Sequence, residues 1–329
     1  MVKIGILGCG RIGQVHVRSI KALNNAQVVA VADAVPKAAD ALAATASARV
    51  STADEIIAAA DVDAVVIGTP TDTHFDLIHK TAAAGKAIFC EKPIDMSVDN
   101  IRTCMKAVEE AGVTFMTGFN RRFDPNFGHL RARIAAGDIG AVELVSITSR
   151  DPAPPPVSYI ERSGGLFRDM MIHDFDMARF LMGEEFVRLH AAGSNLVDPA
   201  IGQAGDVDTA AVILTTASGK ICQLSNSRRA AYGYDQRIEV HGQNGMLRAE
   251  NQLETTVEYA TSDGFRRAPA QHFFLERYGQ AFEAEMASFV SAVTEGTSVT
   301  PGIQDGLQAQ ILADAASAAL ESGQPVELG

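Results

Sequence analysis

The sequence predicts an α/β fold with two parts, an N-terminal doubly wound parallel sheet and a C-terminal α+β domain with an open, mostly antiparallel sheet. Strand-like and helix-like runs alternate over residues 2–120, which is typical of parallel βαβ units. From residue 187 onward, strand-like runs follow one another through short turns such as Ser218-Gly219, which indicates antiparallel pairing. We therefore expect a first domain at 1–120 and a second at 121–329, with C-terminal helices able to pack back on the first.

The first domain contains six apolar runs that we interpret as strands, at 2–8, 27–32, 49–50, 64–68, 87–90 and 113–117. The runs between them have helical periodicity and cover 14–23, 36–46, 53–60, 74–84 and 97–111. Gly85 and Gly112 follow two of these helices as C-terminal caps. In a sheet of this kind, ligands bind at the carboxyl ends of the strands.

The second domain is expected to begin with a helix at 123–136 and a strand at 141–150, followed by a Pro-rich loop at 151–156. A single helix is expected over 166–181. Strands then follow at 187–195, 207–217, 220–227, 236–241, 246–250 and 253–260, and helices at 275–295 and 302–322. Because an open sheet of this size has a face to bury, we expect a homotetramer or a homodimer through it.

Composition excludes several classes of protein. The chain has 329 residues, of which 47% are hydrophobic and 21% charged, as in ordinary globular proteins. A formal net charge of -12 disfavours a nucleic-acid partner. No signal peptide or membrane-length apolar run is visible, so we expect no membrane partner and a cytoplasmic location. The four cysteines lie far apart, so we expect a reducing compartment and no metal site.

A glycine motif at 8–13 (Gly8-Cys9-Gly10-Arg11-Ile12-Gly13) joins the first strand to the first helix. In a Rossmann unit these glycines permit a tight turn, close approach of a pyrophosphate, and close packing of helix on strand. Asp33 ends the second strand 20 residues after Gly13, where an acid bonds the ribose hydroxyls and repels a 2′-phosphate. The motif therefore predicts NAD as cofactor, with Lys37 and Arg11 as the residues that would favour NADP. The alternative is a glycine turn without a ligand.

Two further strand ends carry polar residues, Thr69-Pro70-Thr71 and Glu91-Lys92-Pro93. The first suits the floor of the nicotinamide site, although it also fits a simple proline turn into a helix. The bond before Pro93 is a candidate for the cis form, which only proline tolerates at low cost. The residues that we expect to contact the cofactor are Gly8, Gly10, Arg11, Ile12, Gly13, Asp33, Thr69, Pro70, Thr71, His74, Glu91 and Lys92.

Asp169 and His173 are spaced i and i+4, so the predicted helix places them on one face. A histidine that titrates near neutrality suits the removal of a hydroxyl proton, and a neighbouring carboxylate can orient it. Lys92 would stabilise negative charge on the oxygen as hydride leaves. Because the flanking residues are apolar, the alternative is a core histidine with ordinary hydrogen bonds.

The chain resembles the Gfo/Idh/MocA oxidoreductase family through 8–13, Glu91-Lys92-Pro93, 118–124 and 165–183. Within that family it is most similar to the inositol 2-dehydrogenases, through 121–124 and 232–235. The resemblance implies NAD-dependent oxidation of an inositol hydroxyl to a keto-inositol in inositol catabolism, with Lys92, Asp169 and His173 as catalytic residues and His173 as the general base. The residues implied in substrate binding are Lys92, Asn120, Arg121, Asp151, Asp169, His173, Asp176 and Tyr234.

Three positions in the expected polyol pocket differ from the family's usual residues, namely Asn120, Ser149 and Asp151. They leave open which inositol isomer is recognised. An aldose or pyranose sugar dehydrogenase of the same fold is an alternative function. A non-catalytic NAD-binding regulatory protein is a more distant one, because it would be expected to lack one of the three catalytic residues.

Overall fold

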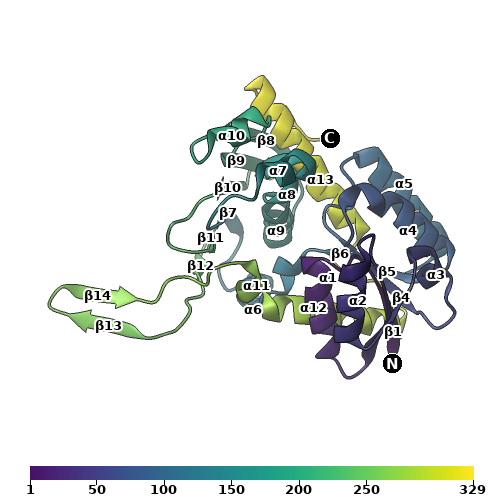
Figure 1. The fold of residues 1–329 in the computed structure, drawn as a ribbon. Helices are drawn as coiled ribbons and strands as arrows, with labels where there is room; N and C mark the ends of the chain where they lie inside the picture. Colours follow the sequence, from purple (N-terminus) through teal and green to yellow (C-terminus); the bar gives the residue numbers. More distant parts are fainter. The chain divides into compact units, whose positions relative to one another are not determined.

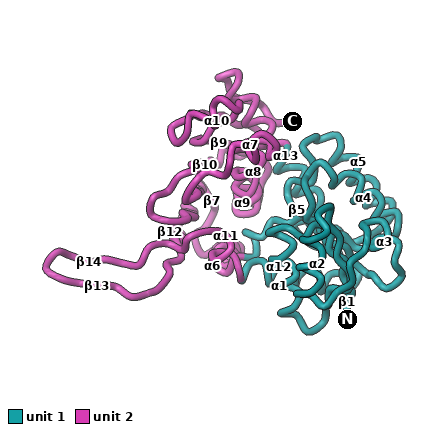
Figure 2. Tube along the Cα trace, viewed as in Figure 1, with its two compact units in different colours: residues 1–123, 280–310 teal, residues 124–279, 311–329 magenta.

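The computed structural model describes residues 1–329, which form two compact units (Figure 2). Unit 1 comprises 1–123 and 280–310, and unit 2 comprises 124–279 and 311–329. The chain therefore leaves unit 1 after Phe123, returns to it after Gly279, and ends in unit 2.

Unit 1 is built on a parallel sheet of six strands in the order β3-β2-β1-β4-β5-β6. The predicted doubly wound sheet is confirmed. The strand order reverses between β1 and β4, which is where sheets of this type bind ligands. The strands are β1 (Val2–Leu7), β2 (Ala26–Ala32), β3 (Arg49–Val50), β4 (Ala64–Ile67), β5 (Ala87–Glu91) and β6 (Phe115–Gly118).

Helices of unit 1 connect successive strands of this sheet (Figure 1). A late helix, α12 (Gly279–Glu295), adds Met286, Phe289 and Val290 to the same hydrophobic core as Ile4. The connecting helices are α1 (Arg11–Lys21), α2 (Pro36–Ala46), α3 (Ala53–Ala58), α4 (His74–Ala83) and α5 (Val98–Ala111), with short 3-10 turns η1 (Thr71–Thr73) and η2 (Asn120–Phe123).

Unit 2 is built on a sheet of seven strands in the order β12-β11-β7-β10-β9-β8-β15. Only β7 and β10 pair in parallel, so the expected mostly antiparallel sheet is confirmed. Burial alternates along the central strands β9 and β10, and helices α9 and α6 contact β7 and β12 of this sheet. The strands are β7 (Val142–Arg150), β8 (Phe186–Ser194), β9 (Thr209–Thr216), β10 (Ile221–Ser227), β11 (Asp235–Gly242), β12 (Gly245–Ala249) and β15 (Val326–Glu327).

The helix expected over 166–181 is wrong as a single element, because the structure divides it into α8 (Gly165–Asp169) and α9 (Ile172–Met182). The Leu166 carbonyl accepts hydrogen bonds from both Met170 and Met171, so the regular helical ladder stops there. Both methionines are buried, and an unbroken helix would turn consecutive side chains by about 100° away from each other. Asp169 and His173 therefore lie on two helices rather than on one continuous face.

Among the other helices, those expected at 123–136 and 302–322 are confirmed, whereas α7 (Val157–Ser163) and α10 (Pro199–Gln203) were not expected. None of the helices in the chain combines the length and apolar character needed to cross a membrane. The helices of unit 2 are α6 (Pro125–Ala135), α7 (Val157–Ser163), α8 (Gly165–Asp169), α9 (Ile172–Met182), α10 (Pro199–Gln203), α11 (Phe274–Arg277) and the end of α13 (Ile303–Ser322).

A two-stranded arm extends from the main sheet of unit 2 (Figure 1). It consists of β13 (Glu258–Thr261) and β14 (Gly264–Arg267), which pair with each other and with no other strand. The strand expected at 253–260 is therefore correct only at its end, and β14 was not expected. All residues of both strands are exposed, so burial gives no alternating pattern from which the pairing could be inferred.

Candidate functional site

The glycine turn in unit 1 is shaped by contacts that exclude side chains. Gly8 has φ +96°, and a Cβ there would lie 2.4 Å from the Gly68 carbonyl oxygen. A Cβ on Gly13 would lie 2.0 Å from the Gly8 carbonyl oxygen. A Cβ on Gly10 would instead meet no atom within 4 Å. The fold itself therefore requires Gly8 and Gly13, and the absence of a side chain at Gly10 leaves open space at the start of α1.

The first turn of α1 is suited to a phosphate. Its N-cap is Gly10, no side chain caps its backbone N–H groups, and its first turn holds no acidic residue. Free N–H groups and the positive end of the helix dipole form a site for an anion. Arg11 and Ile12 begin this helix, with Arg11 exposed. The residues present therefore fit the pyrophosphate of a dinucleotide.

Asp33 connects the end of β2 to the glycine turn. Its Oδ2 accepts a hydrogen bond from the Cys9 N–H at 2.6 Å, and its Oδ1 accepts one from the Val35 N–H at 2.8 Å. The side chain is half-buried. Because each carboxylate oxygen has a second lone pair, the braced carboxylate can still accept hydrogen bonds from ribose hydroxyls.

His74 connects the two other segments that the sequence places at the cofactor. The ring is buried, with Nδ1 3.0 Å from the Pro93 carbonyl oxygen and Nε2 3.0 Å from the Thr69 carbonyl oxygen. Burial lowers the pKa of His74, although the hydrogen bonds to the carbonyls favour the charged form. The segment that directly follows β4 contains Thr69, Pro70 and Thr71. Through its two hydrogen bonds, His74 joins this segment to Pro93 in the segment that follows β5.

The segment Glu91-Lys92-Pro93 ends β5, and its Lys92–Pro93 bond is cis, as the sequence suggested. The Glu91 Oε1 atom lies 2.7 Å from Nε2 of His16, a fully buried residue of α1. The His16 ring also makes an edge contact with Phe89, with ring centroids 4.9 Å apart. The Glu91 carboxylate therefore anchors α1 to β5, and half-buried Lys92 is the next residue.

In unit 2, the acid and the histidine lie on either side of the break between α8 and α9. Asp169 is the last residue of α8, and its Oδ1 accepts a hydrogen bond from the Tyr159 hydroxyl at 2.9 Å. Its Oδ2 lies 3.5 Å from Nη1 of Arg228, a guanidinium with almost no exposed surface. His173 lies in the first turn of α9 and is half-buried. The two residues therefore flank the short junction formed by Met170 and Met171.

Of the expected substrate residues, Asp176 is fully buried on α9. Asp151 follows β7, and Tyr234 precedes β11, at the same end of two paired strands. Tyr234 is buried, with its ring 5.8 Å from that of Phe273. In unit 2, Asp151 and Tyr234 therefore lie at the same end of paired strands, and Asp176 lies on the same helix as His173. Asn120 and Arg121 belong to η2 in unit 1 and are both buried.

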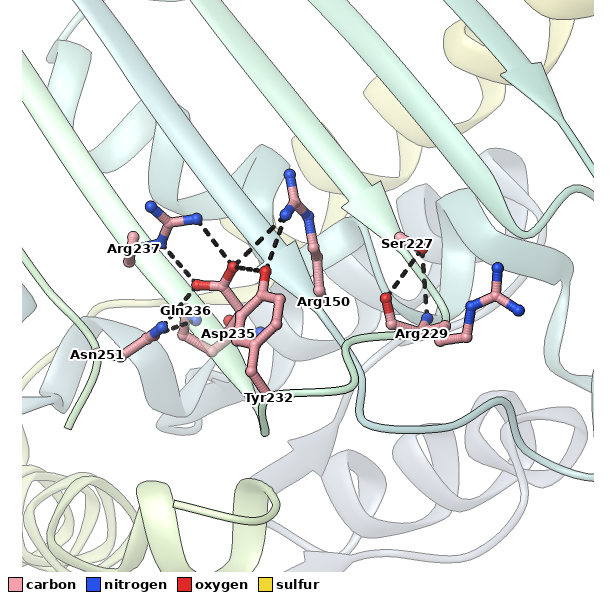
Figure 3. Close-up of polar contacts among 8 residues, drawn as sticks. All are labelled: Arg150, Ser227, Arg229, Tyr232, Asp235, Gln236, Arg237 and Asn251. Carbon is pink, nitrogen blue, oxygen red and sulfur yellow. Dashed lines mark hydrogen bonds and ion pairs between the residues drawn. The ribbon is translucent and has the colours of Figure 1, made fainter. Parts of the chain in front are cut away.

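The segment around Tyr234 also supports a buried carboxylate, shown in Figure 3. Asp235 accepts hydrogen bonds from Tyr232 at 2.6 Å and from Arg237 and Asn251 at 2.7 Å. Burial raises the pKa of Asp235, but these hydrogen bonds outweigh it and the net shift is downward. The same environment raises the pKa of Tyr232, through burial and through Asp235. Asp235 thus holds the 232–235 segment in place.

Ser149, which the sequence placed in the pocket, is fully buried in a polar network. Its Oγ lies 2.9 Å from Oδ1 of Asp174 and 2.8 Å from Oε1 of Gln236. Asn226 donates to Asp174 Oδ2 at 2.7 Å, and Tyr278 lies 3.2 Å from the Gln236 oxygen. This hydrogen-bond network joins α9 to the sheet, so Ser149 helps to fix the position of the helix that carries His173.

Sequence reasoning missed Arg228, Asp206 and Tyr159, although one signal was available. In β10, alternate residues from Cys222 to Asn226 are buried, and the same alternation places Arg228 on the inner side. A charged residue at an inward position is unusual and marks a pairing partner.

No group of three or more His, Cys, Asp or Glu residues is placed to hold a metal ion. The four cysteines are free and buried. Burial, together with the charge of Asp33, raises the pKa of Cys9 to about 11, so this thiol stays protonated in the glycine turn.

Two family models match the chain. Residues 2–119 match an oxidoreductase family with an NAD-binding Rossmann fold. Residues 127–248 match the GFO/IDH/MocA C-terminal domain.

Individual relatives match along almost the whole length. The inositol 2-dehydrogenase of Rhizobium meliloti is 55% identical over 315 residues, which cover 96% of each chain. The myo-inositol 2-dehydrogenase of Thermotoga maritima is 43% identical over 329 residues, 99% of this chain and 98% of that one. A crystal structure of scyllo-inositol dehydrogenase from Lactobacillus casei with bound NAD(H) and scyllo-inositol is 32% identical, with a TM-score of 0.93 and 99% of each chain covered.

The charge of Asp33 should set the choice of dinucleotide. We expect Asp33→Asn to raise the ratio of kcat/KM with NADP to kcat/KM with NAD by about tenfold or more, because the amide keeps an acceptor for the Cys9 N–H but no longer repels a 2′-phosphate. Steady-state rates with both dinucleotides measure this ratio. Asp99→Asn, the same change at an exposed position on α5, is the matched control and should leave the ratio nearly unchanged. An unchanged ratio in Asp33→Asn would mean that Asp33 does not face the ribose.

Proposed function

Because this chain belongs to the GFO/IDH/MocA family of NAD-binding oxidoreductases, we propose that it oxidises one ring hydroxyl of an inositol to a ketone, in inositol catabolism. The observation that carries this proposal is the near full-length similarity to proteins named inositol 2-dehydrogenases. The uncapped first turn of α1 and the braced carboxylate of Asp33 support NAD as the cofactor from the structure itself.

Bound NAD supplies the hydride acceptor of this reaction. We assign the removal of the hydroxyl proton to His173, so that the O–H proton passes to the imidazole as the C–H bond breaks. The neutral imidazole is the form that can accept a proton.

Asp169 and Lys92 act with this base through their charges. Asp169 stabilises the imidazolium that forms, and its orientation is held by the hydrogen bond from Tyr159. The ammonium group of Lys92 stabilises negative charge on the oxygen as the hydroxyl loses its proton. Recognition of the remaining ring hydroxyls is assigned to Asn120, Arg121, Asp151, Asp176 and Tyr234, because a site built to hydrogen-bond hydroxyls rejects analogues that lack them.

The proposed substrate class is tested by following NADH absorbance with purified protein, NAD and a panel of polyols. We expect turnover with at least one of myo-, scyllo- and chiro-inositol and much less with glucose, galactose or xylose. The isomer that reacts fastest identifies the preferred stereochemistry. Faster turnover of a pyranose would contradict the inositol assignment and favour a sugar dehydrogenase of the same fold, whereas no turnover of any polyol would contradict both.

The proton-transfer role predicts the effect of removing the imidazole. His173→Ala should lower kcat by about 10²- to 10⁴-fold, because the hydroxyl proton loses its acceptor, while affinity for NADH stays near that of the wild type. Stopped-flow or steady-state rates and NADH fluorescence measure the two effects. His241→Ala, at an exposed position on β11, is the control. A loss of only a few-fold would mean that another group accepts the proton.

We also propose that unit 2 forms a homotetramer or homodimer through its open sheet face. Ile213, Ile221 and Met246 are exposed on that face, each by more than two fifths of its surface. Contiguous exposed apolar residues on a sheet favour an interface. Sedimentation velocity should show a species of two or four chains, and Ile213→Glu should shift it toward smaller species. A monomer in the wild type would contradict this proposal.

A further inference from the structure

Arg228 is a buried cation placed between two carboxylates of unit 2. Its side chain is 1% exposed, Nη1 lies 3.5 Å from Asp169 Oδ2, and Nη2 lies 3.6 Å from Asp206 Oδ2. Both distances exceed the 2.7–2.9 Å typical of a tight charge-assisted hydrogen bond. One guanidinium is therefore shared by two acids rather than bound closely by either. Burying a guanidinium costs desolvation free energy, and ion pairs this long offset little of that cost.

The backbone fixes where this guanidinium begins. Arg228 follows β10, and its N–H donates to the Asp208 carbonyl at 2.8 Å. The flanking residues Ser227 and Arg229 close a turn through two hydrogen bonds at the Ser227 hydroxyl (Figure 3). The side chain of Arg228 is thus directed to the inner side of the sheet by the strand alternation and held there by the turn.

The two carboxylates contact opposite ends of α8, although only Asp169 is part of this helix. Asp206 Oδ1 accepts the Leu166 N–H at 3.0 Å in the first turn of this short helix, and Asp169 is its last residue. Gly165 has φ +80°, and a Cβ there would lie 2.6 Å from Asp206 Oδ1. Asp206 therefore fits against the start of α8, and Arg228 connects this point to Asp169 at the other end.

We propose that Arg228 is a positioning residue, which orients the Asp169 carboxylate and, through its charge balance with Asp206, sets the proton affinity of the base that Asp169 supports. The inference rests on the proposed function, in which His173 is that base. Arg228 does not itself contact substrate in this account. It acts through Asp169, and Asp206 limits how much of its positive charge Asp169 experiences.

Other charged and titratable groups surround this cluster. The Tyr159 hydroxyl on α7 donates to Asp169, and the Asp208 carboxylate accepts the backbone N–H groups of 196–198. Burial raises the pKa of Asp208, but those hydrogen bonds outweigh it and the net shift is downward. On α8 itself, Arg168 pairs with Asp314 of α13. Substituting Arg228 or Asp206 therefore changes a charge within a defined set of neighbours.

The sign of the effect follows from the reaction. Oxidation requires the base without its proton, so kcat/KM rises with pH through an acid limb. Removing the cation Arg228 makes the site more negative, favours the protonated base, and moves the midpoint of this limb to higher pH. Removing the anion Asp206 leaves more of the positive charge of Arg228 and moves the midpoint to lower pH.

The test compares kcat/KM profiles for inositol oxidation in four proteins, namely the wild type, Arg228→Met, Arg228→Lys and Asp206→Asn. We expect Arg228→Met to raise the midpoint by about one pH unit and to lower kcat about tenfold to a hundredfold. Asp206→Asn keeps the acceptor for Leu166 N–H and should move the midpoint in the opposite direction by a smaller amount. Arg228→Lys keeps the charge and should retain the wild-type midpoint with a reduced kcat.

A merely structural role predicts lower kcat without opposite shifts, so unmoved midpoints in Asp206→Asn and Arg228→Met would overturn the proposal. If Arg228→Met does not fold, the shift in Asp206→Asn and the retained midpoint in Arg228→Lys decide the question. If the wild type oxidises no inositol, the proposed function fails separately. A double-mutant cycle of Arg228→Met with Asp169→Asn in urea unfolding then tests the link, and additive effects would overturn it.

Discussion

The contact between Gly13 and the Gly8 carbonyl oxygen is the constraint on which the cofactor-binding unit depends. It allows α1 to approach β1 and β4 so closely that no side chain fits between them. The start of α1 is thereby placed beside the ends of both strands, with its N–H groups uncapped. Glu91 then fastens the same helix to β5 through His16, one residue before Lys92. The position of Lys92, for which we propose a catalytic role, thus depends on the same helix as the proposed phosphate site.

In unit 2, buried ion pairs fix the positions of individual helices. Asp124 caps α6 and pairs with the buried Arg277, whose guanidinium lies over the Phe127 ring. Arg228 does the same for α8, between Asp169 and Asp206. A single-turn helix has too few internal hydrogen bonds to be stable alone, so such contacts determine where it lies. The acid proposed for catalysis is therefore held by residues distant in the sequence.

Apart from the short edge strand β15, which was not expected, the strands of both sheets follow the apolar runs closely, and Asp33 and the cis Lys92–Pro93 bond lie where the motifs predicted them. The break between α8 and α9 was not predictable from periodicity, because the i, i+4 spacing of Asp169 and His173 is the same with or without a continuous hydrogen-bond ladder. Likewise, an apolar helix face such as that of α12 does not reveal which sheet it covers. Arg228 was missed because alternation was applied only to apolar positions.

The central claim is that the chain transfers hydride from an inositol carbon to NAD. The most direct measurement uses an inositol deuterated at its ring carbons and follows the label by NMR. We expect one deuterium at C4 of the nicotinamide in the NADH that forms, with a slower rate than for unlabelled inositol at saturating cofactor. NADH without deuterium at C4, or label appearing only in water, would contradict it.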